Sequence, residues 1–222
     1  MAKSKIIKEI ANKEISLEVA FNRLLIIASD IENQDLIDWA TNELNGYPSE
    51  VPIPTYRKSG LGLLIYSGIN GSFQVTRQPL PSTALDKDIL DKLKSTNFSQ
   101  DISSIEKFAS DENDHGVIKD LTYLAPLVYA NTQIQCVNIY MKYTKETFIK
   151  ILSAIRTKLL KVFIELDKNL GCLDDLDINI SDKELEKLEE KLNVIIYEDN
   201  SVTIGDSNKL KNNLFQKLGG KK

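Results

Sequence analysis

The stretch that decides the fold is KETFIKILSAIRTKLLKVFIELDKNL, residues 145–170. It is long enough for about seven helical turns at 3.6 residues per turn, and Gly171 follows it as a natural helix terminator. On a helical wheel its apolar side chains form one broad arc. The arc consists of Phe148, Leu152, Ile155, Leu159, Leu166 and Leu170. This periodicity predicts a long helix with one face buried in the core of the protein.

Three more helices are predicted before residue 46, at 3–12, 17–32 and 35–45. Ser16 is a favourable N-cap for the second of them, which is apolar almost all the way round and is therefore expected to be central. The third ends at Gly46, which suits a left-handed cap, and Pro48 prevents its continuation. We expect these helices to form the core together with 145–170.

The region between the two helical parts contains the β signals. GLGLLIYSGINGSFQVTR, residues 60–77, predicts a β-hairpin, because two β-prone runs flank Gly, Asn and Gly. Residues 133–143 predict a buried strand, whereas 117–130 is ambiguous. Short helices are predicted at 86–95, capped by Asp86, and at 99–110, capped by Ser99. The expected fold class is α+β and predominantly helical: a helical core with small antiparallel β-hairpin elements.

Charge divides the C-terminal part of the chain. Residues 142–168 carry seven basic and three acidic side chains, whereas 174–206 carry eleven acidic and three basic ones. The two segments either contact each other or form separate solvated faces. Ser181 and Glu184 form a capping box, and 194–205 suggests a hairpin. The sequence therefore predicts a main domain at 1–172, a small acidic helix-hairpin appendage at 173–205 and a polar tail at 206–222.

The bulk composition narrows the class of protein. The formal net charge is −4, which argues against non-specific polyanion binding driven by overall charge. Cys136 and Cys172 form no CxxC pair and suit a reducing compartment. No apolar run approaches the length of a membrane span, and the N-terminus lacks a secretory core. We expect a cytoplasmic protein without a membrane segment.

Arg156 is an unusual residue in the apolar arc of 145–170. It lies about 40° from Leu152 and about 60° from Leu159 on the helical wheel. Burying an unpaired charge costs several kcal/mol, so its guanidinium needs a partner. That partner is either structural, in an ion pair or a snorkelling arrangement, or an anionic ligand.

Glu43 presents the opposite charge at a similar position. On the helix 35–45 it falls between Trp39 and Leu36, at the border of the apolar face. A carboxylate at such a border needs a partner, and we expect either Arg156 or Arg57 to provide it. Arg23 and Asp30 are further candidates for structural ion pairs, since only four arginines occur among many lysines.

Aromatic and basic residues cluster around the connector that follows Pro48. Tyr47, Tyr56 and Trp39 flank Arg57 and Lys58, and aromatic faces beside cations suit base stacking with phosphate contacts. The same residues could equally serve packing. With Arg156, they form the candidate ligand-binding set Tyr47, Tyr56, Arg57, Lys58 and Arg156.

No catalytic, cofactor or metal signature is present in the sequence. His115 is the only histidine and the two cysteines are far apart, so the usual zinc ligand sets cannot form. The stretch SGINGS matches no P-loop or dinucleotide fingerprint. We assign no catalytic residue, no cofactor and no metal site.

Three stretches together resemble the AbiTii domain family of bacterial abortive-infection, or phage-defence, proteins. They are LEVAFNRLLIIASDIENQDLIDWATNELNGYP (residues 17–48), IPTYRKSG (53–60) and ILSAIRTKLLKVFIELDKNLG (151–171). The resemblance covers most of residues 15–171. It implies a role in antiviral immunity, either as a stand-alone protein or as a regulatory module joined to varied effectors.

Two functions of different class follow from these observations. The favoured one is a non-catalytic module that forms a homo-oligomer, binds a nucleotide or short single-stranded nucleic acid, and regulates an effector or regulator protein encoded nearby. The alternative is a toxin with enzymatic activity on nucleic acid or nucleotides, using carboxylates such as Glu43, Asp35 and Asp38. A third option is a protein-interaction subunit.

Overall fold

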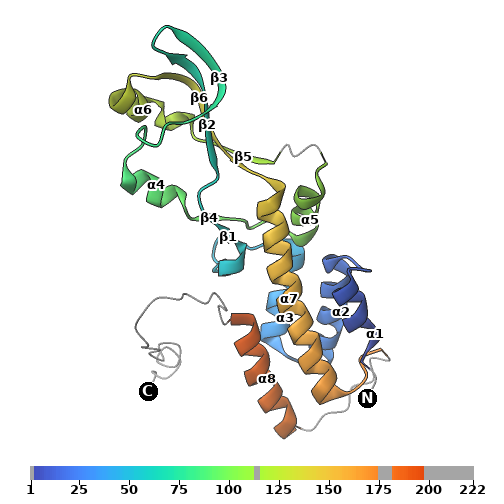
Figure 1. Ribbon diagram of the computed structural model, residues 1–222. Helices are drawn as coiled ribbons and strands as arrows, with labels where there is room; N and C mark the ends of the chain where they lie inside the picture. The colour runs from blue at the N-terminus through green and yellow to red at the C-terminus, as the bar shows by residue number, and fades with distance from the viewer. Residues whose placement is uncertain (1–2, 113–115, 175–181, 198–222) are drawn as a thin grey trace, which may run out of the picture.

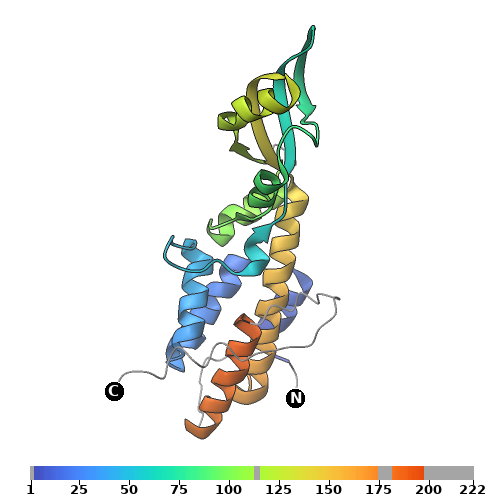
Figure 2. The same cartoon turned by 90° about the vertical axis from the view of Figure 1, so that its left-hand side faces the viewer.

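The computed structural model of the chain describes residues 3–112, 116–174 and 182–197, with only the backbone described at 182–184. The molecule is elongated (Figures 1 and 2), with a helical body at one end and a four-stranded sheet at the other. The long helix α7, Lys145–Leu170, begins two residues after the strand β6, Gln135–Tyr143, and runs from the sheet through the helical body.

The helical body contains the four helices that the sequence predicted for the core, which are α1 (Lys5–Asn12), α2 (Leu17–Asp30), α3 (Gln34–Asn45) and α7. They are joined by α5 (Ile102–Ser110), and by α8 (Asp182–Tyr197), which lies in the segment expected to be an acidic appendage. The side chain of Ser16 accepts a hydrogen bond from the backbone N–H of Val19, so the predicted N-cap of α2 is confirmed. The bounds of α7 match the predicted 145–170.

The sheet has the strand order β3-β2-β6-β5, and all its pairs are antiparallel. The predicted hairpin is formed by β2 (Leu63–Asn70) and β3 (Phe73–Pro79), and the ambiguous stretch contains β5 (Val117–Asp120), a short 3₁₀ turn (Thr122–Leu124) and α6 (Ala125–Thr132). The helix α6 covers one face of the sheet (Figure 2). The fold is thus α+β and mostly helical, as predicted.

A smaller two-stranded sheet joins the two ends of the molecule. Here β1 (Lys58–Ser59), which follows a 3₁₀ turn at Thr55–Arg57, pairs with β4 (Thr96–Asn97), which follows α4 (Lys87–Leu93). This pairing brings the connector after α3 against the segment before α5. It therefore fixes the position of the connector.

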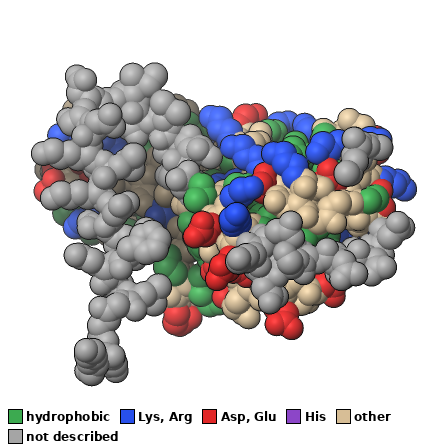
Figure 3. Space-filling view, turned by 90° about the horizontal axis from the view of Figure 1, so that it is seen from below, with side chains coloured by type: hydrophobic (Ala, Val, Ile, Leu, Met, Phe, Trp, Pro, Cys, Tyr) green, Lys and Arg blue, Asp and Glu red, His purple; other side chains and the backbone are tan. Residues whose placement is uncertain are grey.

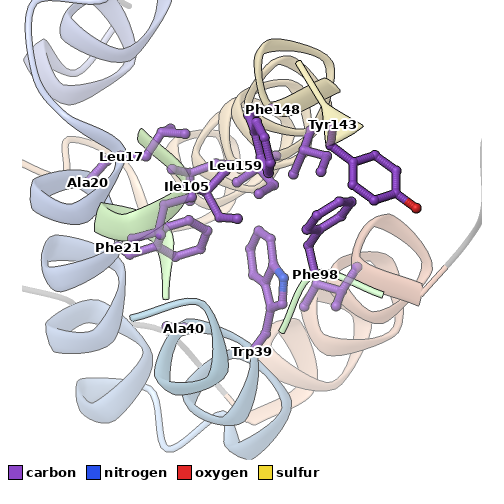
Figure 4. Packing of buried hydrophobic residues seen from close by; sticks show 14 of the residues in the cluster. Leu17, Ala20, Phe21, Trp39, Ala40, Phe98, Ile105, Tyr143, Phe148 and Leu159 are labelled. Carbon is purple, nitrogen blue, oxygen red and sulfur yellow. The ribbon is translucent and has the colours of Figure 1, made fainter. Parts of the chain in front are cut away.

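Aromatic rings in the core meet edge to face, with their planes nearly at right angles. Phe21 of α2 meets Trp39 of α3 edge to face, with ring centroids 5.1 Å apart, and Phe98 makes similar contacts with Tyr143 and Phe148. Figure 4 shows the indole of Trp39 pointing between these rings toward α7. Such edge-to-face pairs add to the hydrophobic stabilisation of a buried cluster.

Three local predictions are wrong. Helix α5 is capped by Asp101, whose carboxylate accepts from the N–H of Ser104, and not by Ser99. The strand β6 is not buried throughout, because Gln135, Val137 and Asn138 are exposed. Residues 194–197 form the last turn of α8 rather than the start of a hairpin.

The last of these errors has a tertiary cause. The β-branched run Val194–Ile196 favours a strand by propensity. However, Leu188, Leu192 and Ile196 recur at helical spacing and are buried in the common hydrophobic core. Packing against α7 therefore decides in favour of a helix. Ser181, His115, residues 198–205 and the tail 206–222 lie outside the described residues, as do the predictions made for them.

Candidate functional site

The candidate site is built on a buried ion pair between α3 and the connector that follows it. Glu43 and Arg57 are both fully buried, and Nη2 of Arg57 lies 2.5 Å from Oε2 of Glu43. Nε of Arg57 lies 3.2 Å from each carboxylate oxygen. Of the two partners that the sequence suggested for Glu43, the structure has Arg57.

Backbone carbonyls satisfy the other side of the guanidinium. Nη1 of Arg57 donates to the carbonyls of Phe98 and Gln100, at 3.1 and 2.5 Å. Burial lowers the pKa of Arg57, but the adjacent carboxylate of Glu43 more than offsets this, and the pKa is raised overall. A buried arginine with this many acceptors links α3 to the segment before α5 and remains charged.

Two tyrosines complete the coordination of Glu43. The hydroxyls of Tyr47 and Tyr56 each donate to Oε1 of Glu43 at 2.8 Å, and Nε1 of Trp39 donates to the hydroxyl of Tyr56 at 2.8 Å. Burial first, and then the negative charge of Glu43, raise the pKa of both phenols. The tyrosine rings are therefore held in fixed orientations by the ion pair behind them.

The turn after α3 depends on Gly46. Its φ of +87° is strained for other residues, and a Cβ atom would lie 2.7 Å from the carbonyl oxygen of Ser99. The next N–H, that of Tyr47, donates to this same carbonyl at 2.8 Å. The Asn-Gly-Tyr-Pro stretch thus places Tyr47 over Arg57, whose Cζ is 5.1 Å from the centre of the tyrosine ring.

A groove of about 800 Å³ opens in front of this network. Its walls come from α3, the connector 47–56, α7 and the C-terminal end of α8. They are mostly aromatic and aliphatic, and include Trp39, Tyr47, Val51, Pro52, Ile53, Pro54, Tyr56, Ile196 and Tyr197. Polar groups are few: Asp38, Thr41, Asn42, Thr55 and Lys158. A groove of this size and lining suits a small ligand with an apolar or aromatic part.

Lys158 connects the groove to α8. Its ammonium lies 5.6 Å from the centre of the Tyr56 ring and donates to the carbonyls of Ile195 and Ile196 at the end of α8. At the rim, the hydroxyl of Tyr197 donates to Asp35 at 3.2 Å, and burial, followed by Asp35, raises the pKa of Tyr197 to about 12. The end of α8 is thus part of the groove wall.

The structure brings together only some of the predicted ligand-binding residues. Tyr47 and Tyr56 line the groove, Arg57 lies behind them without exposed surface, and Lys58 is exposed on the far side of Tyr56. Arg156 lies elsewhere, because two residues correspond to about 200° of helix rotation from Lys158. It donates to the carbonyl of Ile10 at 3.1 Å, and burial lowers its pKa against the opposing effect of Glu106.

The other predicted ion-pair residues lie in the helical body. Arg23 pairs with Glu9 of α1, with Nη1 2.6 Å from the carboxylate. Asp30 is exposed on the last turn of α2 and makes no ion pair with any described residue. Figure 3 shows basic side chains gathered toward one edge of the lower face and acidic ones mostly toward the opposite edge.

The carboxylates named for a catalytic alternative are engaged in contacts of their own. Glu43 is enclosed by Arg57 and two tyrosines, Asp38 accepts from Gln34 at 2.6 Å, and Asp35 accepts from Tyr197. Within the described ranges, no three or more His, Cys, Asp or Glu side chains lie together as a metal site. No helix in the described part of the chain is long and apolar enough to cross a membrane.

The model of the AbiTii family matches residues 4–190, which include every groove-lining residue except Ile196 and Tyr197 of α8. The chain belongs to the AbiTii family. AbiTii is a bacterial abortive-infection family, so membership implies a role in phage defence. No curated protein and no solved structure matches this AbiTii chain.

Several residues of the site were not predicted from the sequence. Thr147, Ile151 and Lys158 lie on one face of α7 by their spacing of four and seven residues, and all three face the Tyr56 region. The spacing was visible in the sequence, but nothing in the chain indicated which element would cover that face. Asp38 and Tyr197 were missed as groove residues for the same reason.

Proposed function

We propose that this AbiTii protein is a non-catalytic defence module whose groove binds a nucleotide or a short single-stranded nucleic acid in the cytoplasm. The observation that carries the proposal is the groove itself: three aromatic rings, fixed by a buried ion pair, line a hollow that also contains a lysine. Rigid aromatic faces beside a cation favour stacking of a nucleobase.

The hydrogen bonds of Glu43 favour a binding function of the groove over a catalytic one. Glu43 receives hydrogen bonds from Arg57, Tyr47 and Tyr56, so its lone pairs are already used. A general base must reach the proton that it removes. Because it is enclosed, Glu43 supports the groove wall rather than acting as a base. No observation of similar weight supports the alternative of an enzymatic toxin.

The experiment is a calorimetric titration of short oligonucleotides and mononucleotides at two salt concentrations. Arg57 is unsuitable for substitution, because a change there would disrupt the buried pair. Thr41→Phe instead fills the groove from α3, and Thr157→Phe makes the same change at an exposed site on α7. We expect saturable binding by the wild type and Thr157→Phe, and loss of binding in Thr41→Phe.

The absence of binding by the wild type would overturn the proposal. Equal binding by Thr41→Phe and Thr157→Phe would place any ligand outside the groove. Weakening at higher salt is expected if phosphate contacts contribute.

We also propose that the protein forms a homo-oligomer through the outer face of its sheet. Leu63 and Ile118 are each 58% exposed and lie in one row on either side of Lys142, next to the row of Ile65 and Tyr140. The helix α6 covers only the opposite face. Every copy carries the same apolar face, so two copies can cover it isologously.

Regulation of an effector completes the proposed function. The end of α8 forms one wall of the groove through Ile196 and Tyr197. A bound ligand would therefore contact the helix that leads into the remaining C-terminal residues. The effector itself would be a partner protein encoded nearby.

A further inference from the structure

A second hollow lies on the other side of Tyr56 from the groove. It has a volume of about 290 Å³ and is lined by Tyr56, Lys58, Ser59, Gly60, Thr147, Lys150 and Ile151. Two elements build it: the strand β1 with the preceding turn, and the first two turns of α7. Tyr56 also lines the groove, so the two hollows share this one residue as a wall.

The lining of this hollow consists largely of hydrogen-bond donors without partners. Lys58 and Lys150 are exposed, and Ser59 and Thr147 are half-buried. Across the described ranges, none of these four side chains forms a hydrogen bond or an ion pair. Glu146, one turn before Lys150, is the acidic neighbour that interacts electrostatically with it, and Thr144 holds that carboxylate through a hydrogen bond.

The two lysine and two hydroxyl side chains that line this small hollow are suited to binding phosphate oxygens. Lysine is a compact point charge with three donors and binds phosphate oxygens, while hydroxyls add neutral hydrogen bonds. The aromatic groove next to it offers little charge of its own, since Lys158 already donates to the carbonyls of α8. The two hollows therefore separate an apolar binding surface from a cationic one.

We propose that the hollow at Lys58 and Lys150 is a phosphate subsite, and that the ligand of the groove is a small nucleotide. Its base lies in the groove against Tyr56, and its phosphate monoester reaches Lys58 and Lys150. This inference rests on the proposed function and narrows it. The volumes of about 800 and 290 Å³ fit one small ligand with two chemically different ends, and not a long strand.

The experiment compares binding of each of the four common ribonucleosides with that of its 5′-monophosphate, by calorimetry at low salt. The variants are Lys58→Gln and Lys150→Gln, with Lys92→Gln, an exposed lysine of α4, as the matched control. We expect the wild type to bind at least one monophosphate about tenfold more tightly than its nucleoside, as charge-assisted hydrogen bonds provide. This preference is lost in Lys58→Gln and Lys150→Gln, and kept in Lys92→Gln and Lys58→Arg.

The outcomes distinguish this inference from the proposed function. Equal affinity for nucleoside and monophosphate in the wild type would overturn the phosphate subsite and leave the groove as a base-binding site. A preference that persists in both glutamine variants would overturn its location at Lys58 and Lys150. Failure of every nucleoside and monophosphate to bind would overturn this inference, and failure of the short oligonucleotides as well would overturn the proposed function.

Discussion

At the scale of single residues, the guanidinium of Arg57 and the carboxylate of Glu43 fix the geometry of the site. Removing one member of a buried pair leaves the other as an uncompensated charge, which costs about 3–5 kcal/mol. We therefore expect Glu43→Leu and Arg57→Met each to lower the free energy of unfolding by this amount. The double variant should lose much less than the sum of the two, as measured by urea unfolding.

A double-mutant cycle provides the decisive comparison for this pair. A coupling energy close to zero between the two changes would contradict the pairing. Glu9 and Arg23 supply a matched control, since their pair is partly exposed, with 43% of the arginine side chain accessible. The corresponding cycle should give a coupling of only about 1 kcal/mol or less.

The tyrosines that donate to Glu43 give a second prediction at this scale. Their pKa values are raised in the folded protein above the usual value of 10.0, so their neutral forms stabilise the fold below pH 10. This contribution decreases as the pH rises above 10, because the unfolded chain then ionises and the folded one does not. In an ultraviolet titration of phenolate absorbance, we expect Tyr47 and Tyr56 to ionise only when the protein unfolds.

Phenylalanine variants test whether the phenolate absorbance that appears on unfolding comes from Tyr47 and Tyr56. Tyr47→Phe and Tyr56→Phe should each reduce the late absorbance change at alkaline pH. If the late change keeps its full size in both groove variants, the hydrogen bonds to Glu43 are absent.

At the scale of secondary-structure elements, α8 is held to α7 partly by charge. Glu165 of α7 accepts from Lys191 of α8 at 2.9 Å, and this contact, followed by Lys168 and Asn169, lowers the pKa of Glu165 to about 2. A carboxylate whose pKa is lowered by folding stabilises the fold at pH values above 4.5, its ordinary pKa. This stabilisation is lost as the pH falls toward 2.

We therefore expect Glu165→Gln to destabilise the protein by about 0.5–1 kcal/mol at pH 7, a small value because the lysine is exposed to solvent. The difference from the wild type should shrink between pH 4.5 and pH 2, as measured by urea unfolding across this range. A constant difference at all pH values would contradict the contact.

The secondary-structure elements also show which features of the fold and the site can be predicted from the sequence alone. The bounds of α7 and the cap of α2 followed from periodicity and from Ser16, which are local signals. The helical end of α8 did not follow from a local signal. Its β-branched residues favour a strand by propensity, but packing against α7 stabilises a helix there. Glu43 could be identified as a residue in need of a partner, but the choice of Arg57 over Arg156 depends on which element packs on α3, and no local pattern encodes that.

At the scale of the whole molecule, the elongated shape separates a helical body with the groove from a sheet with an uncovered face (Figure 1). We expect light scattering after size exclusion to give a mass above that of one 25.0 kDa chain. Leu63→Ser combined with Ile118→Ser should reduce it toward one chain, because the two exposed apolar side chains of this row are lost. Leu127→Ser, on the opposite side at α6, should leave the mass unchanged.

A monomeric wild type at micromolar concentration would contradict self-association through this face. It would leave the groove unaffected, since no residue of the groove lies in the sheet. The two proposals for the molecule can therefore be tested independently.

The most direct test of the account uses the single tryptophan of the chain. Nε1–H of Trp39 donates to the hydroxyl of Tyr56, a residue that lines both the groove and the hollow at Lys58 and Lys150. One indole resonance in a nitrogen–proton correlation spectrum therefore reports on the site. During titration with ribonucleoside 5′-monophosphates, we predict a saturable shift of this resonance for at least one of them. An indole resonance that stays in place through saturating concentrations of all four would contradict a nucleotide site at Tyr56.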